Sequence, residues 1–194
     1  MKKIGILNLG INNIKSITNA CKLISQTYLI NSYKDYDKLT EILVLPGNGN
    51  FATGMKIIEE LGFRDLISEF INSKKKFIGI CLGLQLLMEK SDEAKNVKGL
   101  SLIKGTVKKI DSKKFKVPLL GWYDVKFKNE NINSRGFFFN NGFMVDPVEK
   151  EFIQGEIENI IPAYVVKDNI CGFQFHPEKS SFHGLDLLKN VIFK

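Results

Sequence analysis

Short apolar runs alternate with segments of helical periodicity in the first half of this chain, and this pattern restricts the folds that it can adopt. Apolar runs near 3–9, 41–45 and 77–80 have the length of buried strands. Between them, the stretches 13–25 and 52–73 carry apolar residues at helical spacing. Strands that are apolar throughout are typical of a parallel sheet covered on both faces. The pattern therefore predicts an α/β fold.

The second half of the chain has a different character. Short segments separated by polar turns look like strands, and 183–193 has the pattern of a final helix. These strand segments lie near 101–110, 119–128, 136–145, 152–157, 163–167 and 171–175. We therefore expect a single domain over residues 1–194. Its core is a flavodoxin-like open, mostly parallel sheet with helices on both faces and an antiparallel extension.

One strand runs directly into Gly79-Ile80-Cys81-Leu82-Gly83, and a helix is expected from about 84 to 90. This is the sulfur version of a nucleophile elbow, in which the two glycines permit a sharp turn. The turn places Cys81 at the carboxyl ends of the strands, where active sites of open α/β sheets lie. The start of a helix also favours a thiolate. The alternative is that Cys81 is a small buried residue between two packing glycines.

A base for this cysteine is offered by His176, one of two histidines. Alternating aromatic residues in Phe173-Gln174-Phe175 predict a strand that His176 ends. A cysteine nucleophile needs a base, and the base needs a carboxylate that fixes its tautomer. Glu178, two residues on, is placed for that role. A structural histidine is the alternative for His176, and His183 is expected at the surface.

Acyl transfer also needs hydrogen-bond donors for the developing oxyanion. The backbone N–H of Leu82 follows the nucleophile directly. The loop Pro46-Gly47-Asn48-Gly49 lies at the end of another strand and offers further N–H groups, because glycine lets the backbone approach closely. A plain turn is the alternative for this loop. Gln85, one helical turn after Cys81, is placed to bind an amide substrate.

Charge and hydropathy limit the function classes. The net charge is +7, but the lysines are spread along the chain without the spacing of a nucleic-acid module, so they indicate a solvated surface. An acidic small molecule or partner is also compatible with this charge. No apolar run reaches the roughly 20 residues that span a bilayer. The start of the sequence lacks the pattern of a signal peptide, and a cytoplasmic protein is expected.

Three cysteines stand far apart in the sequence. Their odd number and the absence of paired spacing argue against a disulfide framework and against a zinc site. Cys21 lies on the apolar face of an expected helix, and Cys171 lies in a short strand. Both are expected to be buried packing residues.

Several motifs together resemble class I glutamine amidotransferases: the Pro46–Gly49 loop, Gly79–Gln85 and Phe175–Glu178. Further motifs are similar to the glutaminase subunits of imidazole glycerol phosphate synthases, and this similarity covers essentially the whole chain. These motifs are Asn13 with Ser16, Gly99–Gly105, Pro118–Trp122 and the His-Pro-Glu-Lys-Ser run 176–180.

The resemblance implies a glutaminase in which Cys81 is the nucleophile, His176 the base and Glu178 its orienting group. It implies backbone donors of the oxyanion hole at Leu82, Asn48 and Gly49. It implies that glutamine is held by Gln85, Glu93 and Gly47. No cofactor or metal is implied for this half-reaction.

A partner is implied as well. The family's glutaminase forms a heterodimer with a (β/α)₈-barrel cyclase subunit, which takes the ammonia and makes imidazole glycerol phosphate in histidine biosynthesis. Trp122 and Lys179 match positions at that interface. Neither nucleic acid nor a membrane is expected as a partner.

Two stretches depart from the family pattern. An aromatic strand that usually ends in Val-His-Ser/Thr-Tyr reads Phe137-Phe138-Phe139-Asn140-Asn141-Gly142-Phe143 here, and the N-terminal Asp-Tyr-Gly-x-Gly-Asn reads as residues 8–13. These changes keep open a paralogous subunit that supplies ammonia to a sugar amidotransferase of surface-polysaccharide biosynthesis. A cysteine peptidase of similar fold and a non-catalytic binding module also stay open.

Overall fold

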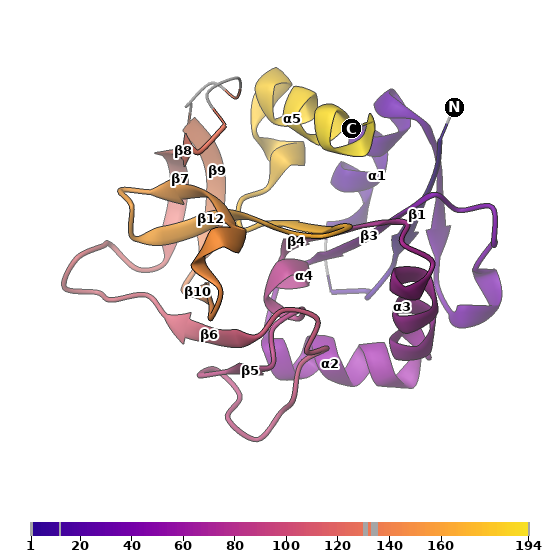
Figure 1. The fold of residues 1–194 in the computed structure, drawn as a ribbon, viewed down its shortest axis with the longest axis horizontal. Coiled ribbons are helices and arrows are strands. Elements are labelled where there is room, and N and C mark those ends of the chain that lie inside the picture. Colours follow the sequence, from indigo (N-terminus) through magenta and orange to yellow (C-terminus); the bar gives the residue numbers. More distant parts are fainter. Residues whose placement is uncertain (1, 12, 130–131, 133–135, 194) are drawn as a thin grey trace.

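The computed structural model describes residues 2–11, 13–129, 132 and 136–193. A large sheet crosses the middle of the molecule (Figure 1). The helices α1 (Ile14–Ile24) and α5 (Ser181–Phe193) cover one face of it, and α2 (Phe51–Glu60) and α3 (Phe63–Asn72) cover the other. The expected three-layer arrangement is therefore present.

Eight strands form the large sheet. In spatial order they are β2 (Gln26–Ile30), β1 (Lys3–Leu7), β3 (Ile42–Gly47), β4 (Lys76–Cys81), β13 (Ile170–Phe173), β12 (Ile161–Lys167), β11 (Ile153–Ile157) and β8 (Lys126–Phe127). The first five run parallel to one another, in the strand order of flavodoxin-like folds. The last three continue the sheet with antiparallel pairing. The fold class predicted from the sequence is confirmed.

Two smaller sheets form the extension on the left of Figure 1. One contains β5 (Lys90–Ser91), β6 (Gly105–Lys109) and β10 (Phe143–Pro147); the other pairs β7 (Leu119–Asp124) with β9 (Gly136–Asn141). Short 3₁₀ turns are η1 (Tyr33–Asp35), η2 (Lys150–Phe152) and η3 (Pro177–Lys179). The expected strands 119–128 and 136–145 are each divided in two, because their halves pair with different strands.

The apolar runs are continuous because the sheet is buried on both faces. Along β4, Phe77 packs into the core under α2 and α3, whereas Ile78 and Ile80 pack into the core under α1 and α5. Successive side chains of a strand point to opposite faces, so a strand between two cores needs apolar residues at every position.

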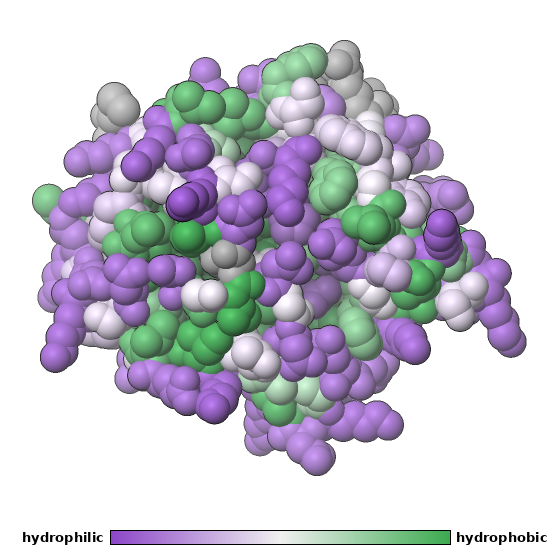
Figure 2. Space-filling view, turned by 180° about the vertical axis from the view of Figure 1, so that it is seen from behind, coloured by the Kyte–Doolittle hydropathy of each residue, from purple (hydrophilic) through white to green (hydrophobic). Residues whose placement is uncertain are grey.

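The surface is of mixed character. On the face seen in Figure 2, hydrophilic residues surround several separate hydrophobic patches. Within the described part of the chain, none of the helices combines the length and the apolar character that crossing a bilayer requires.

The helix expected from about 84 to 90 is wrong in extent. The structure has only the single turn α4 (Leu82–Gln85). Beyond it, the carbonyl groups of residues 86–88 accept hydrogen bonds from the backbone N–H groups of 100–103. These long-range bonds replace the helical ones, so the segment leaves the helical path. A four-residue helix also has a small dipole, so it stabilises a thiolate at Cys81 less than the expected longer helix would.

Gly83 is required by the close approach of α4 to β3. A Cβ atom at this position would stand 1.7 Å from the carbonyl oxygen of Leu45, a contact that no rotamer change relieves. Gly83→Ala is therefore expected to lower the free energy of unfolding by about 3 kcal/mol or more. Urea unfolding followed by circular dichroism measures it.

Gly142→Ala is the matched control, because the nearest atom to a Cβ there is Val117 Cγ1 at 3.8 Å. That variant should stay within about 0.5 kcal/mol of the parent. Equal stabilities of the two variants would contradict the close approach of α4 to β3.

Candidate active site

The carboxyl ends of three neighbouring parallel strands bring the candidate residues together. β3 pairs with β4 so that Gly47 lies opposite Cys81. β13 is the neighbour of β4 on its other side, and His176 follows three residues after β13 ends at Phe173. The loop after β3, the cysteine and the histidine thus share one edge of the sheet, as the sequence predicts.

Cys81 occupies a strained turn between β4 and α4. Its backbone has φ +54° and ψ −109°, a combination that residues other than glycine rarely adopt. The residue is 4% exposed. The sharp strand-to-helix turn expected from Gly-x-Cys-x-Gly is therefore present, and the strain is of the kind that marks nucleophile elbows.

His176 and Glu178 form a buried pair. The imidazole Nδ1 lies 2.9 Å from Oε1 of Glu178, and both side chains are about 95% buried. Burial acts to lower the pKa of His176, but the side chains of Cys81 and Glu178 outweigh it and raise the pKa well above the usual value. The pair therefore supports a charged imidazolium near Cys81.

The second imidazole nitrogen is left for the cysteine. Nε2 is buried and makes no hydrogen bond of good geometry to any residue that the structure describes. Catalytic hydrogen bonds are often long or poorly aligned without substrate and tighten when it binds. The side-chain arrangement leaves Nε2 as the nitrogen that can exchange a proton with sulfur.

Ser180 holds the histidine turn against β9. Its hydroxyl donates to the carbonyl of His176 at 2.6 Å and accepts from the backbone N–H of Phe138 at 3.0 Å. The N–H of His176 in turn donates to the carbonyl of Phe138 at 2.9 Å. The serine of the 176–180 motif thus fixes the backbone that carries the imidazole.

The loop after β3 faces the histidine across a narrow crevice. Gly47, Asn48, His176, Glu178 and Lys179 all contribute to its lining, and its volume is about 20 Å³. That space holds about one water molecule and is too small for a glutamine side chain. Cys81 does not line this crevice, so the crevice is not the space in which a substrate meets the sulfur.

Gly47 packs tightly on the residue that follows the cysteine. A Cβ at position 47 would come within 2.9 Å of Cβ of Leu82. The loop backbone therefore lies as close to the elbow as two chains can approach. This proximity is what N–H donors from both segments need in order to share one oxygen atom.

Gln85 and Glu93 occupy different surroundings. Gln85 is buried, and its Nε2 donates to the carbonyl of Phe143 at 3.1 Å and to Oε1 of Gln174 at 3.2 Å. Its amide protons are engaged, so its free group is the oxygen. The carboxylate of Glu93 accepts from the N–H of Phe51 at 2.7 Å, at the start of α2 and next to the loop.

Gln174 belongs to the site and was not singled out from the sequence. It is fully buried, and its Nε2 lies 4.0 Å from the sulfur of Cys81. Its oxygen accepts from Gln85, so two amides connect the sulfur with the start of β10. The available signal was a lone amide between Phe173 and Phe175 in an otherwise apolar segment.

Trp122 and Lys179 meet at one aromatic ring. The indole of Trp122 is 54% exposed and packs edge-on against Phe138, with ring centroids 6.2 Å apart. The ammonium of Lys179 lies 5.7 Å from the centroid of the same ring. His183, which we expected at the surface, is partly exposed, and its Nε2 donates to the carbonyl of Gly136 at 2.7 Å.

The remaining two cysteines differ from Cys81. Cys21 and Cys171 are buried in the apolar core, as expected from the sequence. Burial raises the pKa of each thiol to about 12. Both therefore stay protonated and unreactive at neutral pH.

The chain belongs to the class I glutamine amidotransferase family, since the family model described as "Glutamine amidotransferase class-I" matches residues 6–194. Among curated proteins it is similar to imidazole glycerol phosphate synthase subunit HisH of Thermotoga maritima, with 38% identity over 98% of this chain and 96% of that protein. The subunit of the same name from Halalkalibacterium halodurans is 34% identical over 96% of this chain and 94% of that protein. The resemblance seen in the motifs is confirmed.

Solved structures support the fold. A crystal structure of a glutamine amidotransferase matches with a TM-score of 0.79 at 17% identity, over 97% of both chains. The structure of PurLQS from Thermotoga maritima matches with a TM-score of 0.76 at 16% identity, over 98% of this chain and 97% of that one.

Removing the carboxylate beside His176 should lower the pKa of the imidazole. Because the folded-state pKa is raised, the charged pair stabilises the fold fully below the unfolded pKa of about 6.5, and this contribution is lost as the pH rises through the raised value. Glu178→Gln should therefore shift the titration of His176 downward.

The measurement is an NMR titration of the imidazole protons, which is simple because the chain has two histidines. A His183→Asn variant assigns the two signals. An unchanged His176 titration in Glu178→Gln would show that the carboxylate does not support the charged ring.

Proposed function

We propose that this chain is the glutaminase subunit of an imidazole glycerol phosphate synthase of histidine biosynthesis. It hydrolyses glutamine to glutamate and ammonia, and it passes the ammonia to a cyclase subunit. The observation that carries the proposal is the 34–38% identity to HisH subunits over nearly the full length of both chains. The edge of the sheet at which Cys81, His176 and Glu178 meet supports the same chemistry.

Cys81 acts as the nucleophile in this proposal. Its thiolate attacks the side-chain carbonyl carbon of glutamine, and the electron pair of the carbonyl bond moves to oxygen. The tetrahedral intermediate then breaks its carbon–nitrogen bond as His176 donates a proton to the departing ammonia. A thioester of Cys81 with the glutamyl group results.

Water completes the reaction. His176, now neutral, takes a proton from the water that attacks the thioester. The thiolate leaves, glutamate is released and the imidazolium is restored. Glu178 fixes the ring tautomer through Nδ1 and supports the charged form at both stages, as its 2.9 Å contact with the ring allows.

Backbone N–H groups of Leu82, Asn48 and Gly49 form the oxyanion hole. Gly47 lies opposite Cys81 in the strand register and against Leu82, which makes convergence of these donors feasible. We expect slow turnover by the isolated subunit and faster turnover once a docked partner aligns the oxyanion donors.

Gln85, Glu93 and Gly47 hold the substrate. The oxygen of Gln85 is the group that stays available for a donor of glutamine, since its nitrogen is engaged by Phe143 and Gln174. Glu93 supplies a negative charge beside the loop, which suits the α-ammonium group of an amino acid.

Trp122 and Lys179 contact the partner, a (β/α)₈-barrel cyclase subunit in a cytoplasmic heterodimer. Tryptophan is among the residues enriched in interface hot spots, and the indole of Trp122 is exposed. Ammonia released into water would become protonated and lose its nucleophilicity. Passage through the interface therefore preserves the reactive form.

A second candidate keeps the chemistry and changes the acceptor to a sugar nucleotide of polysaccharide biosynthesis. The observation behind it is the altered strand at residues 140–143. Asn141 stands there, 7% exposed, with its Nδ2 bound to the carbonyl of Phe143 and its Oδ1 buried without a partner among the described residues. Altered surroundings of the glutamine pocket fit a subunit that serves a different partner.

Cys81→Ala should reduce glutamate release in the presence of the cyclase subunit by at least about 10³-fold, because the covalent route is removed. Enzymatic quantitation of glutamate measures it. Cys171→Ala is the matched control: its thiol is buried and protonated, so activity should stay within about twofold while stability falls slightly. Undiminished activity of Cys81→Ala would end the proposed mechanism.

Trp122→Ala should weaken the complex with the cyclase by about 30-fold or more, because a buried interface tryptophan contributes about 2 kcal/mol or more. Titration calorimetry measures the Kd. Leu39→Ala, at an exposed apolar residue outside the site, should leave the Kd unchanged. Failure to bind the cyclase, with binding to a sugar amidotransferase of the same organism, would instead establish the second candidate.

A further inference from the structure

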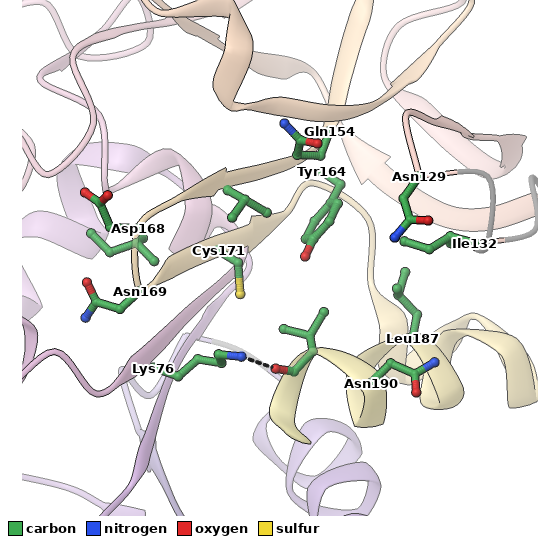
Figure 3. Close-up of a pocket in the computed structure, with 13 residues that line it drawn as sticks. Lys76, Asn129, Ile132, Gln154, Tyr164, Asp168, Asn169, Cys171, Leu187 and Asn190 are labelled. Atoms are coloured by element: carbon green, nitrogen blue, oxygen red, sulfur yellow. Dashed lines mark hydrogen bonds between the residues drawn. The ribbon is translucent and has the colours of Figure 1, made fainter. Parts of the chain in front are cut away.

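A second cavity lies at the opposite end of β4 from the candidate active site. It opens between β12, β13 and α5 and has a volume of about 310 Å³ (Figure 3). Lys76, the first residue of β4, lines it, whereas Cys81 is the last residue of that strand. The two residues are five positions apart along the strand, or about 17 Å. The volume is in the lower range of small-molecule sites.

The hydroxyl of Tyr164 points into this cavity (Figure 3). The residue is 9% exposed, and the part of it that stays accessible faces the cavity. Its ring is clamped, stacked on Phe173 at 4.9 Å and edge-on to Phe127 at 6.1 Å, so the hydroxyl cannot swing out to bulk water.

Tyr164 is available as a donor. Burial raises the pKa of its hydroxyl well above the usual value, and the group keeps its proton over the physiological range. An acceptor atom placed in the cavity would therefore complete its hydrogen bonding.

Lys76 provides a positive charge on the wall of the same cavity. Its ammonium donates to the carbonyl of Val191 at 2.6 Å, near the end of α5, which uses one of three protons. Burial lowers the pKa of this lysine, and the nearby charge of Lys2 lowers it further. An anion beside the ammonium would relieve both effects.

The remaining walls combine aliphatic side chains with the polar residues Asn129, Gln154, Asn169 and Asn190. The side chains of Leu187, Val191 and Ile170 line the cavity, and the thiol of Cys171 points into it between Tyr164 and Lys76 (Figure 3). The carboxylate of Asp168 belongs to an exposed residue and points away from Tyr164. The cavity thus places a hydroxyl and an ammonium group beside the aliphatic side chains of α5.

We propose that this cavity binds a small molecule with a carboxylate on an apolar body. The carboxylate accepts from the Tyr164 hydroxyl and the Lys76 ammonium, and the apolar body packs against α5. The site is separate from the glutaminase chemistry and does not depend on it.

Benzoate is the probe, and benzamide is its neutral counterpart of the same shape. On the full chain, benzoate should bind with a Kd of about 1 mM or tighter, by ligand-observed NMR. Benzamide should bind about tenfold more weakly, because it lacks the charge. In a methyl spectrum, benzoate should shift the signals of Leu187 and Val191. Equal binding of the two probes, absence of binding, or shifts confined to other methyl groups would overturn the proposal.

Tyr164→Phe and Lys76→Met test the two donors. Each should weaken benzoate binding by about tenfold. Tyr123→Phe is the matched control, because its ring also packs edge-on against a phenylalanine, at 5.8 Å, but lies outside the cavity. The affinity of Tyr123→Phe for benzoate should not change. Full affinity in Tyr164→Phe would overturn the proposal.

Discussion

The register of three parallel strands is the constraint on which the site depends. Gly47 lies opposite Cys81 because β3 and β4 pair in one particular register, and β13 continues this alignment toward His176. A shift by one residue would turn every side chain of a strand to the other face of the sheet. The two apolar cores prevent such a shift, since both faces of β4 are buried. Packing far from the cysteine therefore determines which groups meet it.

The charge of the His176 imidazole is the second requirement of the site. An imidazole buried as deeply as that of His176 would ordinarily lose its charge. The side chains of Cys81 and Glu178 together reverse this and raise the pKa of His176, and the carboxylate of Glu178 lies at hydrogen-bond distance from the ring. The neighbouring polar groups of Gln174 and Ser180 are satisfied by other parts of the site. The polar edge of the sheet is thus a connected network enclosed by apolar residues.

Local sequence patterns predicted most of the fold and the core of the candidate site. The elbow around Cys81 and the pairing of His176 with Glu178 need few neighbours, and both could be derived from short motifs. The end of α4 depends on backbone bonds to residues 100–103, and the hydrogen bond of His183 is made to Gly136, 47 residues away. Contacts between residues far apart in the sequence produce no recognisable pattern in the local sequence. Gln174 was overlooked because one amide in a strand resembles ordinary alternation.

Phe138 gives the outer edge of the molecule a mechanical connection to the imidazole. Its backbone is bonded on one side to His176 and on the other to Ser180, while its ring touches Trp122 and Lys179. Phe138 is thus the single residue between the exposed indole and the backbone that carries the imidazole. A partner that displaces the indole would therefore act, through Phe138, on the position of His176.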